Sequence, residues 1–165
     1  MIRENTTLAL AATMTALGLL LVPSWKGELL EPCQLALVAA AFTVVLLLAA
    51  RMMGARGLAT ERAVLALFLA GMPMVYLARG GWQWIEGLGL AVFGTCAFLG
   101  WRRFAWLLPV GILAHGLAWD SWHYFGGAAD IPAWYSLGCM LVDVGVGAYA
   151  AVRVAKHAGQ SGYTK

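Results

Sequence analysis

The sequence predicts an all-α membrane protein with six transmembrane helices. Of its 165 residues, 62% are hydrophobic and only 12% are charged, whereas soluble domains are about 45–50% apolar and about 25% charged. The mean hydropathy is +0.77. A backbone inside lipid must satisfy its own hydrogen bonds, and the apolar runs do not alternate as the strands of a membrane barrel do. We therefore expect each run to be a helix.

Six apolar runs give the predicted spans, because about 17–25 residues are needed to cross about 30 Å of hydrocarbon as a helix. Proline, tryptophan or charged residues bound most of the runs. In chain order they are residues 7–22, closed by Pro23; 33–50, closed by Arg51; 63–78, between Arg62 and Arg79; 82–100, starting at Trp82; 104–125, after Arg102 and Arg103; and 133–152, between Pro132 and Arg153. The polar segment 157–165 is expected to be a flexible tail of this single membrane domain.

The positive charges orient the predicted bundle. When the connectors are assigned alternately to the two sides, nine lysines and arginines fall on the side of both termini, against Lys26 and Arg79 on the other. Cytoplasmic loops carry the excess of positive charge. We therefore expect both termini in the cytoplasm and the protein in a bacterial inner membrane.

Composition excludes two other classes. The net charge of +3 comes from scattered residues and forms no basic stripe, so no nucleic-acid partner is expected. The three cysteines, at positions 33, 96 and 139, contain no CxxC pair and do not make a disulfide framework.

Five ionisable side chains lie in the last three predicted spans, and none lies in the first two. They are Glu86, His115, Asp120, His123 and Asp143. Such a group costs about 2.5–3.5 kcal/mol at the centre of a membrane helix, so it usually has a function or a partner. At a rise of about 1.5 Å per residue, the first, third and fourth lie within about 7 Å of the outer boundary, and the other two about 15 Å down.

These two depths predict two groups. In the deep group, His115 and Asp143 are expected to meet across neighbouring helices as a catalytic acid–base pair. In the outer group, Asp120 and His123 are three residues apart on one helix, and with Glu86 they form an expected site for a divalent metal. Nitrogen and oxygen ligands suit zinc, iron or manganese, although no HExxH motif is present.

Three further residues complete the predicted site as substrate-binding groups: Tyr76, Trp119 and Cys139. Cys139 precedes Asp143 by one helical turn and is expected to share its face. The substrate implied by a pocket inside the membrane is a hydrophobic small molecule, reached from the outer side.

Plainer interpretations remain open beside this one. Asp120 and His123 are also typical of solvated residues at a helix end, and His115 with Asp143 is also typical of a structural hydrogen bond worth about 1 kcal/mol or less. The enzyme interpretation therefore stands beside two alternatives: a non-catalytic subunit of a larger membrane complex, and a proton-coupled carrier, which a homo-oligomer would favour.

The polar motifs resemble a known family. The stretch His115-Gly-Leu-Ala-Trp119-Asp120-Ser-Trp-His123 is followed by Ser136-Leu-Gly-Cys139 and Asp143, and it is preceded by Tyr76-Leu77, Gly80 and Glu86. Over about residues 60–155 this pattern resembles a family of small bacterial integral-membrane proteins known as a domain of unknown function. The chain departs at Tyr124, where the family has the second of two adjacent histidines, and at Val142, where it has a cysteine. A site that needs both histidines would be incomplete here.

Overall fold

The computed structural model describes residues 43, 45, 48, 49, 51, 52, 58–80, 83–126 and 131–161. The chain divides into the units Met1–Leu30 and Glu31–Lys165, and all described residues belong to the second. The first predicted span, residues 7–22, and most of the second, residues 33–50, lie outside the described residues.

The described residues are helical, with no strand among them, which confirms the predicted all-α class for this part of the chain. In order, the elements are α3 (Leu58–Gly80), α4 (Trp84–Arg102), α5 (Leu107–Ala114), the π-helical η1 (His115–Asp120), α6 (Ser121–Tyr124) and α7 (Ala133–Ser161). The elements α5, η1 and α6 follow one another without a break and form one helical run.

Among the described residues, three helices are long and apolar enough to cross a membrane, judged by length and composition: α3 over Ala59–Ala78, α4 over its full length, and α7 over Ala133–Ala158. They match the third, fourth and sixth predicted spans, and the run from α5 to α6 matches the fifth. Two ends differ from the prediction. Helix α3 begins before residue 63, and α7 continues past residue 152 into the predicted tail. The predicted spans ended at charged residues, whereas Glu61 and Arg153 lie inside these helices and pair with each other.

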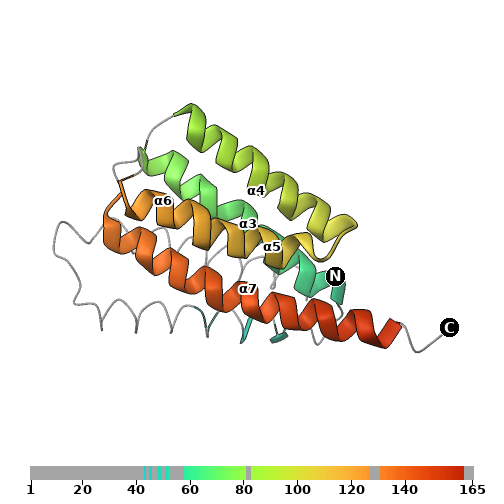
Figure 1. The fold of residues 1–165 in the computed structure, drawn as a ribbon. Helices are drawn as coiled ribbons and strands as arrows, with labels where there is room; N and C mark the ends of the chain where they lie inside the picture. The colour runs from blue at the N-terminus through green and yellow to red at the C-terminus, as the bar shows by residue number, and fades with distance from the viewer. Residues whose placement is uncertain are drawn as a thin grey trace, which may run out of the picture. The chain divides into compact units, whose positions relative to one another are not determined.

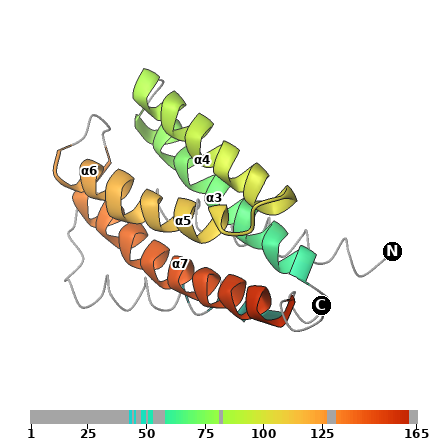
Figure 2. The same cartoon turned by 45° about the vertical axis from the view of Figure 1, so that its right-hand side comes forward.

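The helices pack in two contacting pairs. Helix α3 packs against α4, and the run from α5 to α6 packs against α7, as both Figure 1 and the rotated view of Figure 2 show. Helix α5 also contacts α3 and α4 and so joins the pairs. Leu69, Leu108, Ile112 and Val146 are 0% exposed and form the centre of the apolar core.

Large apolar side chains also cover the outside of the described helices. Leu67, Met74, Phe98, Val110 and Leu117 are each more than half exposed. Soluble monomers rarely expose large contiguous apolar patches. An apolar outer surface around buried polar side chains is compatible with a membrane protein.

An ion pair joins the start of α3 to α7. Glu61 is 2% exposed and accepts two bonds from Arg153, Nε to Oε1 at 2.7 Å and Nη2 to Oε2 at 2.6 Å. The Tyr149 hydroxyl donates to Oε1 at 2.7 Å. The sequence analysis missed Glu61 because it placed this residue in a connector. A signal was available, because Glu61 precedes the predicted span 63–78 and Arg153 follows the predicted span 133–152, so both lie on the same predicted side of the membrane.

Arg153→Met is expected to lower the free energy of unfolding by about 1–3 kcal/mol, because it leaves the buried Glu61 carboxylate with only the Tyr149 hydroxyl. Thermal unfolding of the detergent-solubilised protein measures the effect. Arg103→Met is the control, since Arg103 is exposed. Equal melting temperatures for the two variants would show that the ion pair does not stabilise the fold.

Candidate functional site

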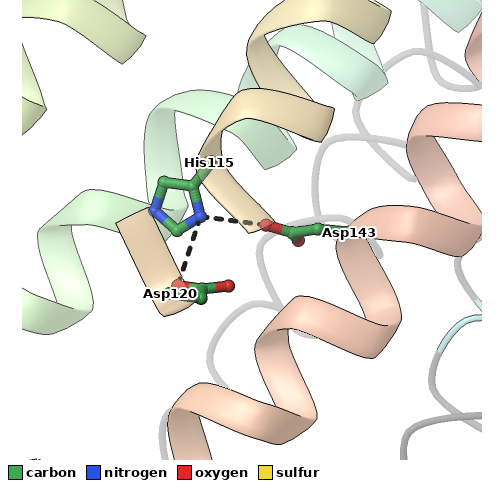
Figure 3. A group of neighbouring side chains, drawn as sticks. All are labelled: His115, Asp120 and Asp143. Carbon is green, nitrogen blue, oxygen red and sulfur yellow. Dashed lines mark hydrogen bonds and ion pairs between the residues drawn. The ribbon is translucent and has the colours of Figure 1, made fainter. Parts of the chain in front are cut away.

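The buried polar residues gather at the end of the helices opposite to Glu61. The nearest on α3 is Tyr76, about 22 Å from Glu61 along the helix axis. We call His115, Asp120 and Asp143 the His/Asp/Asp group. These three side chains come from η1 and α7 and are at most 1% exposed, and Figure 3 shows both carboxylates turned toward one nitrogen of the imidazole ring.

One ring nitrogen serves both carboxylates. Nδ1 of His115 lies 2.9 Å from Oδ2 of Asp143 and 3.5 Å from Oδ1 of Asp120. Ionised carboxylates only accept hydrogen bonds, so Nδ1 carries a hydrogen when both carboxylates are ionised. The predicted contact between His115 and Asp143 is therefore confirmed, and Asp120 joins it.

The π-helical geometry of η1 explains why Asp120 belongs to this group. In an α-helix, residues five apart lie about 140° apart around the axis. In a π-helix, the hydrogen bonds run from i to i+5, so residues five apart lie nearly above one another. His115 and Asp120 therefore share one face. The sequence analysis assumed α-helical spacing throughout and separated them into two depths.

A glycine lets α7 approach this turn. A Cβ atom placed on Gly116 would lie 2.5 Å from Cβ of Asp143, closer than nonbonded carbon atoms pack. The absence of a side chain at position 116 thus brings the Asp143 carboxylate within hydrogen-bond distance of His115.

Tyr76 holds the second carboxylate. Its hydroxyl donates to Oδ1 of Asp120 at 2.6 Å, and its side chain is 1% exposed. Its ring centroid lies 6.0 Å from that of His115 and 4.1 Å from that of His123. Tyr76 was predicted to bind substrate. The structure does not test that role. It shows that Tyr76 donates a hydrogen bond to Asp120 and that its ring lies against both histidines.

A second group lies on the other side of Tyr76. His123 Nε2 is 3.0 Å from Oε1 of Glu86, and its Nδ1 is 2.9 Å from the carbonyl oxygen of Trp119. Glu86 is 0% and His123 5% exposed. We call these two side chains the Glu86–His123 pair.

The predicted metal set of Glu86, Asp120 and His123 therefore needs correction. Glu86 and His123 do meet, but Asp120 faces His115 and Tyr76 instead, because of the π-helical turn. Within the described residues, the group whose potential ligand atoms gather, all within 4.8 Å of one another, is His115, Asp120 and Asp143. This buried group could hold a metal ion.

Several buried polar atoms around the two groups have no hydrogen-bond partner among the described residues. They include Oδ2 of Asp120, Nε2 of His115, Oε2 of Glu86 and Nε1 of Trp119. Most buried polar atoms in proteins are paired. In the described part of the chain, moreover, no lysine or arginine forms an ion pair with these carboxylates. The site therefore combines unpaired donors and acceptors with more acidic than basic side chains.

Aromatic and sulfur side chains line the same region. The Phe93 ring packs edge-on against the rings of His115 and Trp119, with distances between ring centroids of 4.8 and 5.8 Å. The Tyr135 ring packs edge-on against Tyr76, with 6.2 Å between the centroids. The sequence analysis assigned no role to Phe93 or Tyr135. A signal for Tyr135 was present, because it precedes Cys139 by four residues, as Cys139 precedes Asp143, so the three share a face of α7.

The family comparison adds membership without an activity. A family model matches residues 34–156, about three quarters of the chain. The chain belongs to DUF6010, a family of unknown function. The match begins before residue 60, where the resemblance noted in the sequence starts, and covers most of the second predicted span. No curated protein and no solved structure matches the sequence.

This DUF6010 chain departs from the family's motif at two positions, Tyr124 and Val142. Neither side chain takes part in the polar contacts described above. Tyr124, at the position of the second histidine, is 40% exposed, and Val142 is a buried core residue at 8%. The His/Asp/Asp group therefore forms without a histidine at position 124.

Gly116→Ala is expected to destabilise the protein by about 1–3 kcal/mol through overpacking against Asp143. Thermal unfolding in detergent measures the change. Gly94→Ala is the matched control, because a Cβ atom at Gly94 meets nothing within 4 Å, and its melting temperature is expected to be unchanged or slightly higher. If the two variants melt together, the close approach of α7 to η1 is not a packing constraint.

Proposed function

We propose that this chain is a small integral-membrane enzyme that acts on a hydrophobic small molecule at the His/Asp/Asp group. In this proposal it crosses a bacterial inner membrane six times with both termini in the cytoplasm. The three apolar helices, the exposed apolar side chains and the distribution of positive charge support the membrane placement. Its partners are the lipid bilayer and the substrate, and a homo-oligomer or a larger membrane complex is compatible with it.

The observation that carries the proposal is the surplus carboxylate of the His/Asp/Asp group. Two carboxylates lie beside one imidazole, so even a protonated imidazole leaves one carboxylate that must either stay charged or take up a proton. Burying an uncompensated charge costs several kcal/mol. A purely structural contact between helices would gain nothing from this arrangement, whereas a site that binds a cation or moves protons depends on it.

We propose a divalent cation, zinc, iron or manganese, as the cofactor at this group. Metal–ligand bonds of about 2.0–2.2 Å place neighbouring ligand atoms about 2.8–3.6 Å apart in octahedral or tetrahedral sites. The separations of His115 Nδ1 from the two carboxylate oxygens, 2.9 and 3.5 Å, lie in this range. The cation would replace the hydrogen on Nδ1, because metal binding releases protons from its ligands. A carboxylate ligand is often oriented by a hydrogen bond from outside the coordination sphere, as the Tyr76 hydroxyl does for Asp120.

A cation at this position would polarise a water molecule or a carbonyl group, which suits hydrolysis or hydration of a substrate from the lipid phase. His115 and Asp143 are the catalytic residues of the proposal, as ligands of the cation, and a carboxylate oxygen of the group would accept the proton of the attacking water. Tyr76, Trp119 and Cys139 are the proposed substrate-binding residues. Nε1 of Trp119 is a buried donor without a partner among the described residues, and it is available to a polar atom of the substrate.

Protein purified without chelators is expected to contain close to one transition-metal ion per chain, because three buried ligand atoms gather at one point. Elemental analysis by mass spectrometry measures the content. His115→Gln and Asp143→Asn are expected to lose the ion. Glu86→Gln is the matched control and is expected to keep it, since Glu86 pairs with His123. Metal lost only in Glu86→Gln would favour the ligand set predicted from the sequence.

The enzyme proposal is tested with the purified protein reconstituted in vesicles of the expression host's total lipid extract. Mass spectrometry of the lipids and apolar metabolites before and after incubation is expected to show one class consumed. His115→Gln and Asp143→Asn, checked for unchanged elution in gel filtration, are expected to reduce this conversion at least about 100-fold. No conversion by the wild type, or equal conversion by all three proteins, would refute the enzyme proposal.

A further inference from the structure

The hydrogen-bond partners of His123 determine where its protons lie. Its Nδ1 is 2.9 Å from the carbonyl oxygen of Trp119, and a carbonyl oxygen only accepts, so Nδ1 carries a hydrogen. Its Nε2 is 3.0 Å from Oε1 of Glu86. One further proton therefore lies between Nε2 and Oε1. It belongs either to an imidazolium beside a carboxylate or to a carboxylic acid beside a neutral imidazole.

Both forms of the Glu86–His123 pair have zero net charge. This distinguishes the pair from the His/Asp/Asp group, where two carboxyl groups share one imidazole. A neutral pair is stable among apolar neighbours without a lysine or arginine. The shared proton can move from one partner to the other without creating net charge, so the pair is suited to store a proton and to give it up.

One oxygen of the pair is available for a reacting molecule. Oε2 of Glu86 is buried and has no hydrogen-bond partner in the part of the chain that the structure describes. In the acid form of Glu86, rotation of the carboxyl group presents the proton at this free position. Gly89, one turn further along α4, lies against the Trp119 ring, because a Cβ atom there would be 2.5 Å from that ring. Glu86 and Trp119 thus belong to the same packed contact between α4 and η1.

Tyr76 connects the pair to the His/Asp/Asp group. Its ring lies 4.1 Å from the His123 ring, and its hydroxyl binds Asp120. A molecule held at the His/Asp/Asp group therefore lies within the length of one tyrosine side chain of the pair. His123 is also the most exposed histidine of the two groups, at 5%, and it lies at the end of the helical run, one residue before its last residue, Tyr124.

We infer that the Glu86–His123 pair is the proton donor of the reaction proposed for the His/Asp/Asp group. During hydrolysis, water attacks the substrate and its proton passes to the His/Asp/Asp group, while the bond to the leaving group breaks. The leaving group takes its electron pair and receives the proton of Glu86. The pair is then a carboxylate beside a neutral imidazole. It regains one proton from solvent through His123, and the His/Asp/Asp group releases to solvent the proton that it took from water, so both groups return to their starting state. This inference rests on the proposed function.

The test uses the same reconstituted protein and the substrate class identified by the lipid analysis. Glu86→Gln keeps the shape of the side chain but cannot donate its proton as an acid. It is expected to lower turnover about 100- to 10,000-fold and to leave the metal content unchanged. In Glu86→Ala, added formate or acetate is expected to restore part of the turnover in proportion to its concentration, because a small acid replaces the missing donor. Glu61→Gln, which removes a buried carboxylate at the other end of the helices, is expected to keep full turnover.

The outcomes separate the two proposals. Wild-type turnover in Glu86→Gln, together with an inactive His115→Gln, overturns the proton-donor role and leaves the enzyme proposal standing. An inactive Glu86→Ala that formate and acetate do not rescue assigns the pair a positioning role, which also overturns the inference. Loss of metal in Glu86→Gln has the same consequence, since the variant then acts through the cation site. Turnover in His115→Gln removes the proposed function itself.

Discussion

Carboxylates enclosed in an apolar bundle must find hydrogen bonds or positive charge, and most of the local geometry of this protein follows from that requirement. Asp120 and Asp143 lie beside one imidazole nitrogen. Three features make this contact possible: the π-helical turn that puts His115 and Asp120 on one face, the glycine at position 116 that admits α7, and the Tyr76 hydroxyl. The turn and the glycine belong to η1, the hydroxyl to α3 and the Asp143 carboxylate to α7, so the contact exists only after these three elements have packed together.

The three buried ionic groups of the described residues differ in how completely they are satisfied. Glu61 receives two bonds from Arg153 and one from Tyr149, which accounts for a contact that stabilises the packing of α3 on α7. The Glu86–His123 pair is neutral but keeps a free oxygen. The His/Asp/Asp group has unpaired atoms and one carboxyl group more than it has imidazoles. The share of polar atoms with a partner therefore decreases from the first group to the third.

Composition and the lengths of the apolar runs were enough to predict the helices that the structure describes, because long helices depend on local spacing. The list of buried ionisable residues was also predictable, since a charge inside an apolar run stands out. The pairing of those residues was only partly predictable. His115 with Asp143 followed from depth alone, whereas Asp120 was misassigned because the π-helical turn leaves no sign in an ordinary helical wheel. Glu61 was missed because its partner lies 92 residues away.

A π-helical turn is equivalent to one extra residue inserted in an α-helix. The wider turn takes up the rotation of that residue, about 100° in an α-helix, so the helix after Asp120 keeps its direction around the axis. An ordinary α-helix of the same sequence would turn His123 away from Glu86 and Asp120 away from His115, although its hydrophobic composition would be identical. Deleting one residue inside the turn would instead bring residues 115 and 120 four positions apart, a spacing that shares one face of an α-helix. The local winding of one helix, and not its composition, therefore decides which buried side chains meet.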